Sequence, residues 1–197
     1  PPPPPPYPYT TLFRSALWYS DLRNSTGLAD QLSVEGFLEL LNVYFDCAAG
    51  AVIEEGGQVL DIVGDAILAF FPADVAGEEA AATSALRAAL NAQERLAAAK
   101  ARQCPCAAEI NFGVGVHFGD VVFGNAGTRE RLKFGVIGRT VNEVARTQDM
   151  SKLLGQPIVA TDQVVSRARS EPGLRLNDMG LHDLRGIPVA KRLWALR

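Results

Sequence analysis

Residues 56–72 constrain the fold of this chain more than any other stretch. Two short apolar runs, residues 59–63 and 66–71, flank a Gly64-Asp65 pair, and this pattern is typical of a β-hairpin. Because apolar side chains dominate both runs, we expect the hairpin to lie centrally in a sheet and to be covered. Asp65 then lies at the hairpin tip, where a buried carboxylate is costly unless it is paired. For a lone Gly-Asp pair, a turn aspartate that bonds its own backbone is the simpler interpretation.

A second aspartate offers Asp65 a partner. A strand-like run ends on Asp21, and a polar, turn-prone segment with the hydroxyl residues Ser25 and Thr26 follows. If the two strands are neighbours in one sheet, the two carboxylates meet. A Mg²⁺ ion suits such a pair, because it brings its own waters and the phosphates of a substrate and takes only one or two carboxylates from the protein.

Four sequence blocks, in this order, resemble the catalytic domains of class III adenylate and guanylate cyclases. They are Asp-Leu-Arg-x-x-Thr at residues 21–26, Gly-Gly-x-Val-x-x-x-x-Gly-Asp-Ala at 56–66, the glycine-rich run at 115–127, and the block at 136–146 that contains Asn142 and Arg146. The resemblance covers the chain from about Ala16 to its end. It implies an α+β fold with a ferredoxin-like βαββαβ core and C-terminal additions.

The resemblance also implies roles for individual residues. Asp21, Asp65 and the backbone carbonyl of Leu22 match the ligands of two divalent metal ions, Mg²⁺ or Mn²⁺. Asn142 and Arg146 match the pair that orients the ribose and stabilises charge on the phosphates. In the family these two groups of residues come from different protomers, so we expect a head-to-tail homodimer with composite active sites.

Two further positions are assigned to substrate binding. Thr26 closes the first block, and Arg185 matches a position where the family often has a basic residue that reaches the triphosphate. A solvated loop arginine is an equally good interpretation of Arg185. The implied reaction is the conversion of ATP, the family's usual substrate, to 3′,5′-cyclic AMP and pyrophosphate, which serves signal transduction.

The base-reading positions depart from the adenylate cyclase pattern. ATP-using members usually carry a lysine four residues before the second metal aspartate and Asp or Thr seven residues before the Asn, whereas this chain has Asp61 and Gly135. A carboxylate can accept from the two adjacent donors of guanine, N1–H and the N2 amine. Guanylate cyclase activity is therefore the main alternative, and a catalytically weak, regulatory nucleotide-binding domain is another. An unrelated ferredoxin-like binding module would lack the four blocks.

Composition and charge fit one globular domain. Residues 1–15 are a proline-rich, low-complexity leader that we set aside as a sequencing or assembly artefact, and residues 16–197 form the predicted domain. The chain is 48% hydrophobic with a net charge of −3, which disfavours nucleic-acid binding. No apolar run is long enough to predict membrane contact. The three cysteines suit reduced thiols in a cytoplasmic protein, although an upstream regulatory domain or anchor is compatible with the sequence.

The remaining pattern predicts three long helices, a short helix after Thr161 and several strands. Apolar spacing predicts helices over residues 33–55, 77–102 and 140–154. The first of these helices is expected to be capped by Ser33 and to turn Leu41 and Phe45 toward the core. Alternation predicts a strand over 110–118 that turns at Gly119-Asp120. Glycines at alternate positions of that strand indicate a close neighbour.

His117 is interpreted as a structural residue because no carboxylate is adjacent in the sequence. Asn142 and Arg146 lie four residues apart and share a helix face; a surface ion pair of Arg146 with Asp149 is the alternative.

Overall fold

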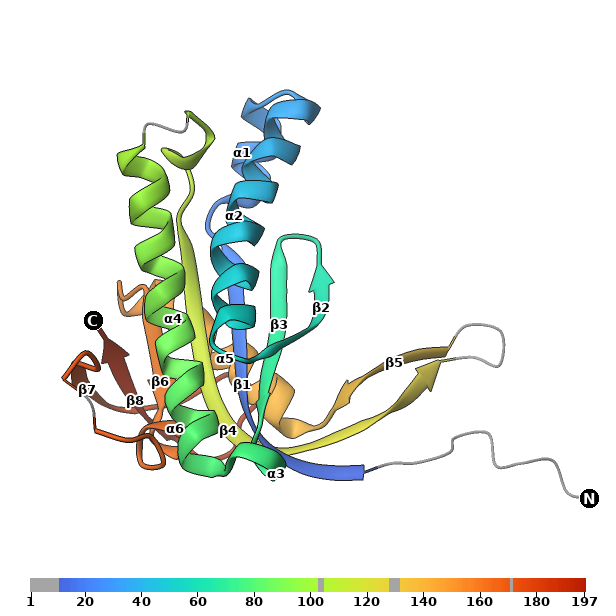
Figure 1. Cartoon of the computed structure of the whole chain (residues 1–197), viewed down its shortest axis with the longest axis vertical. Helices are drawn as coiled ribbons and strands as arrows, with labels where there is room; N and C mark the ends of the chain where they lie inside the picture. Colours follow the sequence, from blue (N-terminus) through green and yellow to red (C-terminus); the bar gives the residue numbers. More distant parts are fainter. Residues whose placement is uncertain (1–10, 103–104, 128–131, 171) are drawn as a thin grey trace, which may run out of the picture.

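The computed structural model describes residues 11–102, 105–127, 132–170 and 172–197, which form one mixed β-sheet with helices on both faces (Figure 1). The strand order is β2-β3-β1-β4-β6-β8-β7, and β5 pairs with β4 beside this row. The strands are β1 Thr11–Leu22, β2 Gln58–Val63, β3 Ala66–Pro72, β4 Phe112–Gly127, β5 Leu132–Ile137, β6 Ile158–Thr161, β7 Leu176–His182 and β8 Lys191–Leu196. The helices are α1 Ser25–Gln31, α2 Val34–Glu54, α3 Ala73–Ala76, α4 Glu78–Ala101, α5 Arg139–Leu153 and α6 Asp162–Val165, and Pro105–Ala107 form a short 3₁₀ turn.

The predicted ferredoxin-like core is confirmed. The elements β1, α2, β2, β3, α4 and β4 follow each other as βαββαβ, apart from the short helices α1 and α3 and the short turn, and their strands lie in the order β4-β1-β3-β2. Each neighbouring pair in this core is antiparallel. The C-terminal additions extend the sheet through β6, which is parallel to β4, and through β8 and β7.

Side chains of β1 and β4 alternate between two apolar layers. Ala16, Trp18 and Phe112 are buried with the inner faces of α2 and α4, which lie side by side on one face of the sheet (Figure 1). Leu17 belongs to the smaller cluster on the other face, which also contains Val144 of α5. The period of two in each strand thus divides the core between α2 and α4 on one side and α5 on the other.

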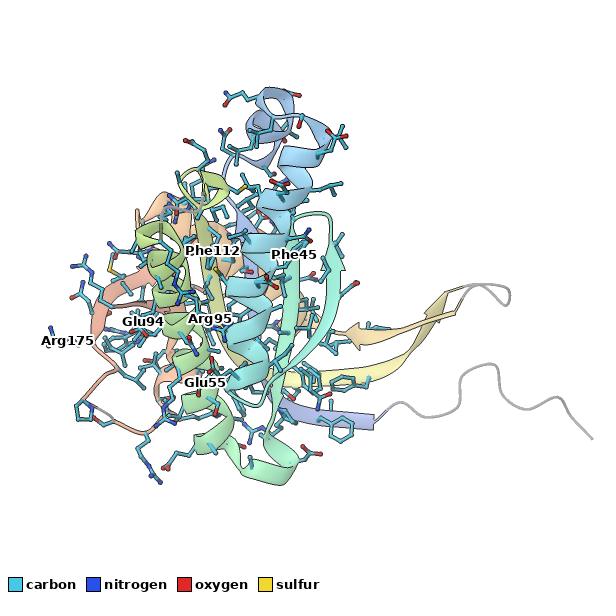
Figure 2. All side chains as sticks on the ribbon, turned by 45° about the horizontal axis from the view of Figure 1, so that its top comes forward. Phe45, Glu55, Glu94, Arg95, Phe112 and Arg175 are labelled. Atoms are coloured by element: carbon cyan, nitrogen blue, oxygen red, sulfur yellow. The ribbon has the colours of Figure 1, made fainter. Side chains whose placement is uncertain are left out.

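Helix α2 begins as predicted, because the Ser33 hydroxyl accepts a hydrogen bond from the Gly36 N–H at 3.1 Å and caps the first turn. Its buried face is centred on Leu40 and Tyr44, whereas Leu41 and Phe45, two of the residues predicted to face the core, are only partly buried. Arg95 of α4 joins the two helices by donating to the Glu54 carboxylate at 2.8 Å, and Figure 2 shows Arg95 beside α2.

By length and composition alone, α2 could also cross a membrane, contrary to our expectation that no apolar run is long enough. In the structure its buried residues belong to the main core cluster. A core helix of a globular domain passes the same test of length and apolarity, so this feature is weak evidence of a membrane span.

Three local expectations differ from the structure. Strand β2 lies at the edge of the sheet, and Ile62 and Val63 are 47% and 64% exposed, so the hairpin is neither central nor fully covered. Strand β4 continues through Gly119 and Asp120 without the expected turn, because this segment pairs with β1. Strand β1 begins at Thr11, so the boundary expected at Ala16 falls inside a strand; residues 1–10 of the expected leader lie outside the described residues.

The arm formed by the ends of β4 and β5 projects away from the body of the domain (Figure 1). It begins where β4 leaves the sheet beyond its pairing with β1. Cys104, whose thiol was expected to be reduced, lies outside the described residues, as do residues 128–131.

Candidate functional site

Two aspartates meet at the end of strands β1 and β3. Asp21 is opposite Ala66 in the β1–β3 register, so Asp65, one residue before Ala66, lies beside it. The two side chains are hydrogen-bonded, and the backbone N–H of Leu22 donates to Asp21. Burial, followed by the charge and the hydrogen bond of Asp65, raises the pKa of Asp21 to about 6. The pair is therefore a site of concentrated negative charge that a cation would relieve.

A cleft of about 340 Å³ opens beside Asp21. Its walls come from the end of β1, from the loop into α1 and from α5, and they include Leu22, Thr26, Asp149 and Lys152. The chain turns from β1 into α1 at Asn24, whose φ of 59° is left-handed, a conformation that asparagine adopts more readily than most residues. The turn brings the Thr26 segment to the same cleft as Asp21.

The oxygen atoms that line this cleft are suitable ligands for a hard divalent cation. The described residues contain no group of three or more His, Cys, Asp or Glu side chains arranged to hold a metal. Two carboxylates and oxygen-bearing loop residues suit Mg²⁺ or Mn²⁺, which retain waters and accept phosphate oxygens as further ligands. Among the described residues, the main causes that act on the pKa of Asp21 are burial and the neighbouring acidic groups Asp65 and Asp149, and no cationic side chain is among them.

Asn142 and Arg146 line a second cleft, of about 270 Å³. Both project from α5, and the opposite wall is the loop of residues 185–188, which includes Arg185. The alternative contact of Arg146 is also present, because its Nη1 lies 2.8 Å from Oδ2 of Asp149. Both partners are about half exposed, and such an ion pair contributes little to stability.

The structure therefore divides the expected site residues between two clefts of one chain. Asp21, Leu22 and Thr26 line the first, beside Asp65, and Asn142, Arg146 and Arg185 line the second. Helix α5 contributes to the walls of both clefts. Of these two clefts, Asp21 lines the first and not the second, and Asn142 and Arg146 line the second and not the first.

Asp61 lies on β2 and Gly135 on β5, two strands that do not pair but contact each other. The residues beside them, Leu60 and Val136, pack against the same apolar cluster. A side chain at Gly135 would meet no other atom within 4 Å, so open space surrounds this position. The two expected base-reading positions are thus on elements that contact each other.

Sequence reasoning missed a buried charged cluster that includes Glu143. His117 Nε2 lies 2.6 Å from Oε2 of Glu143, and Lys191 Nζ lies 3.2 Å from the same oxygen. The expectation that His117 has no carboxylate partner is therefore wrong, because the partner comes from α5 rather than from nearby sequence. Burial lowers the pKa of His117, and the hydrogen bond from His117 is the main cause that lowers the pKa of Glu143 to about 2.

A family model described as the adenylate and guanylate cyclase catalytic domain matches residues 12–195. "Adenylate cyclase 1" of Rhizobium meliloti (strain 1021) is 31% identical over 152 residues, which are 77% of this chain and 23% of that protein. "Adenylate cyclase" of Anabaena cylindrica is 29% identical over 157 residues, which are 77% of this chain and 30% of that protein. The chain thus spans less than a third of the length of these curated relatives.

Solved structures of both kinds of cyclase share the fold. The adenylyl cyclase CyaB from P. aeruginosa superposes with a TM-score of 0.84 at 21% identity, covering 96% of each chain. The guanylyl cyclase Cya2 superposes with a TM-score of 0.80 at 24% identity, covering 95% of this chain and 93% of that one. At these identities the likeness establishes the fold and leaves the choice between adenine and guanine open.

Proposed function

This chain belongs to the family of adenylate and guanylate cyclase catalytic domains, and from this premise we propose that it converts ATP to 3′,5′-cyclic AMP and pyrophosphate. The observation that carries the proposal is the Asp21–Asp65 pair: the two carboxylates are hydrogen-bonded, and Asp21 lines a cleft of about 340 Å³. In cyclisation, the ribose 3′-oxygen loses its proton and bonds to the α-phosphorus, and the bond from that phosphorus to the pyrophosphate oxygen breaks.

Asp21 and Asp65, with the Leu22 carbonyl, would hold two divalent ions. When bound, such ions favour ionisation of the attacking hydroxyl and neutralise charge on the leaving pyrophosphate. The protein's own groups position the substrate, since a phosphoryl transfer of this kind needs orientation and charge stabilisation rather than covalent catalysis.

The second cleft supplies the groups that orient the nucleotide. Arg146 offers a planar fork of donors to phosphoryl oxygens as their charge grows, and Asn142 holds the ribose. Arg185 faces the same cleft and binds the phosphate chain, and Thr26, in the first cleft, adds a hydroxyl donor.

We propose a homodimer in which the first cleft of one protomer faces the second cleft of its partner. Two features of the chain support this assembly. Asp21 and the Asn142–Arg146 pair line different clefts. Ile62, Val63 and Ile137, on β2 and β5, are exposed by 47%, 64% and 49%, and neighbouring exposed apolar side chains mark contact surfaces.

Guanylate cyclase activity is the second candidate, and Asp61 favours it. A carboxylate accepts hydrogen bonds from both donors on the guanine edge, whereas the adenine edge offers one donor and one acceptor. Gly135 contributes no side chain that could read the remaining atom of adenine.

The direct test supplies the purified chain with Mg²⁺ or Mn²⁺ and offers ATP and GTP separately, with both cyclic products quantified. We expect one cyclic nucleotide from the unsubstituted chain. We also expect a loss of at least about a hundredfold in kcat for Asp65→Ala, since preorganised charge at a reaction centre is commonly worth this much. Asp74→Ala, an exposed aspartate of α3, is the matched control. Absence of any cyclic product, or full activity of Asp65→Ala, would contradict the proposal.

A further inference from the structure

Helix α5 lies directly on the sheet, because one face of β4 is almost free of side chains over residues 113–119. Gly113, Gly115 and Gly119 alternate along this face, and a Cβ added to any of them would approach α5 within 2.8 Å. His117 occupies the one position of this row that carries a side chain. Its Nε2 contacts the Glu143 carboxylate, and its Nδ1 forms a hydrogen bond with the Thr161 hydroxyl at 2.7 Å.

Glu143 is consequently fixed from several sides. The Glu143 side chain is 6% exposed, and its Oε2 contacts His117 Nε2 of β4 and accepts a hydrogen bond from Lys191 Nζ of β8. The other carboxylate oxygen, Oε1, accepts a hydrogen bond from Nε of Arg139 at 2.8 Å, and Arg139 lies one turn earlier on α5. The buried carboxylate thus connects the sheet to a guanidinium whose own side chain is 64% exposed.

Arg139 reaches the same cleft as the residues already assigned to the nucleotide. Arg139, Asn142 and Arg146 follow a spacing of three and four residues, which places them on one helix face, and all three line the cleft opposite Arg185. The lining contains three arginines and no acidic residue among the described residues. Because Glu143 engages Nε, the two terminal nitrogens of Arg139 have no recorded partner in the described part of the chain.

We propose that Arg139 is a further substrate-binding residue, which contacts the phosphate chain of the nucleotide, and that Glu143 is the positioning residue that orients its guanidinium. Arginine suits this task because its terminal nitrogens bind two phosphate oxygens at once. A carboxylate held by three side-chain donors, His117, Lys191 and Arg139, has little freedom to move, so the guanidinium that it binds is oriented before substrate arrives. This inference rests on the proposed nucleotide cyclase function.

The first experiment measures steady-state kinetics of Arg139→Ala with the nucleotide that the chain cyclises. We expect KM to rise roughly tenfold while kcat changes less than about threefold, since a charge-assisted contact to a non-reacting phosphate contributes mainly to binding. Arg169→Ala removes an equally exposed arginine that pairs with Glu79 of α4, on the other face of the sheet, and is expected to leave both constants unchanged.

The second experiment measures binding of inorganic tripolyphosphate by calorimetry in the presence of Mg²⁺, and it does not depend on catalysis. We expect the Arg139→Ala chain to bind this probe roughly tenfold more weakly than the unsubstituted and Arg169→Ala chains. Equal binding by all three, or no binding by the unsubstituted chain, would overturn the inference even if cyclisation is observed. A chain that makes no cyclic product but shows the expected difference would contradict the proposed function and leave the phosphate contact supported.

The role of Glu143 is tested by a double-mutant cycle. Glu143→Ala should raise KM as Arg139→Ala does, and the double variant should add little to either single change, because both disturb one contact. Glu143→Gln keeps an oxygen that accepts from Arg139 Nε, so it should restore most of the affinity. Additive effects of the two substitutions, or a KM for Glu143→Ala equal to that of the unsubstituted chain, would show that Glu143 does not act through Arg139.

Discussion

Asp21 is a residue at which stability and the proposed activity oppose each other. Its pKa is raised from 3.8 to about 6, so the folded chain binds this proton more tightly than the unfolded chain. The free energy of unfolding contributed by this group is therefore largest below about pH 4, is lost as pH rises from about 4 to 6, and stays lower above that range.

Asp21→Asn should remove this loss. Without divalent cations we expect the substitution to raise Tm by about 2–4 °C near pH 8 and to leave Tm nearly unchanged near pH 4. Such a rise corresponds to roughly 1 kcal/mol for a domain of this size, a value reduced for solvent screening of a half-buried group. The same variant should lose cyclase activity, and thermal unfolding at the two pH values measures the effect.

Asp74→Asn, at an exposed aspartate of α3, controls for the removal of one negative charge. A gain that is equal at both pH values, or larger near pH 4, would show that repulsion between Asp21 and Asp65 is not its source.

Base selection is a second prediction at the level of one residue. If Asp61 reads guanine, GTP competes with ATP, and Asp61→Lys should shift the ratio of kcat/KM values toward ATP by about ten- to a hundredfold. A lysine brings a donor to N1 of adenine and faces the N1–H of guanine with donor against donor, and such a mismatch in a pocket costs roughly 1–3 kcal/mol. Gly135 limits the shift because no side chain there completes the reading of adenine.

The kcat/KM values for ATP and GTP, measured on the same preparations, decide the matter. The Asp74→Ala chain again provides the control, since it removes an aspartate from another part of the fold. An unchanged ratio in Asp61→Lys would mean that residue 61 does not contact the base.

The contact between β4 and α5 is the element on which both clefts depend. A Cβ at Gly115 would lie 2.5 Å from the backbone nitrogen of Gln148 and 2.8 Å from its Cα, and a backbone cannot retreat as a flexible side chain does. Gly115→Ala should therefore force α5 away from the sheet and lower the free energy of unfolding by about 2–3 kcal/mol. It should also lower kcat, because α5 carries Asn142 and Arg146.

Denaturant unfolding and cyclase assays measure the two effects. Gly173→Ala is the matched control, because a Cβ there meets nothing within 4 Å, and it should leave stability within about 0.5 kcal/mol. If Gly115→Ala is as stable as Gly173→Ala, α5 does not press on β4 in the way the structure describes.

For helices and strands, sequence patterns predicted the features that depend on local sequence and missed those that depend on pairing with distant segments. The hairpin of residues 58–72, the Ser33 cap and the long helices follow from turn chemistry and apolar spacing, and all are present. The edge position of β2 was not predicted, because an apolar strand has the same sequence pattern at an exposed edge as in the middle of a sheet. The continuation of β4 through Gly119 depends on its pairing with β1, which is distant in sequence.

The candidate site shows the same division. The Asp21–Asp65 contact was predicted because both residues end or begin strands that proved to be neighbours. The His117–Glu143 contact was missed because it joins a strand and a helix 26 positions apart, 143 − 117, and no local pattern connects them. The row of glycines that His117 interrupts was the available signal, and it indicated a close element without indicating which side chain would meet His117.

At the scale of the whole molecule, the separation of the two clefts predicts that activity requires two chains. Asp65→Ala removes one carboxylate of the Asp21–Asp65 pair, and Arg146→Ala removes a guanidinium of the second cleft. Each variant alone should be nearly inactive.

In a mixed dimer, however, one composite site combines the intact carboxylates of the Arg146→Ala chain with the intact Arg146 of the Asp65→Ala chain, and the other site carries both lesions. With random pairing, half of the dimers are mixed and each has one intact site of two, so an equimolar mixture should recover up to about a quarter of the unsubstituted activity. The mixture is assayed after heterodimers are demonstrated with two affinity tags. A mixture of Asp65→Ala with Asp21→Ala serves as the control. Both of these substitutions affect the same carboxylate pair, so their mixed dimer contains no intact site. Recovery in the first mixture alone supports composite sites. Equal inactivity of both mixtures, with heterodimers present, would mean that each chain assembles its site by itself and that the two clefts close on each other within one protomer.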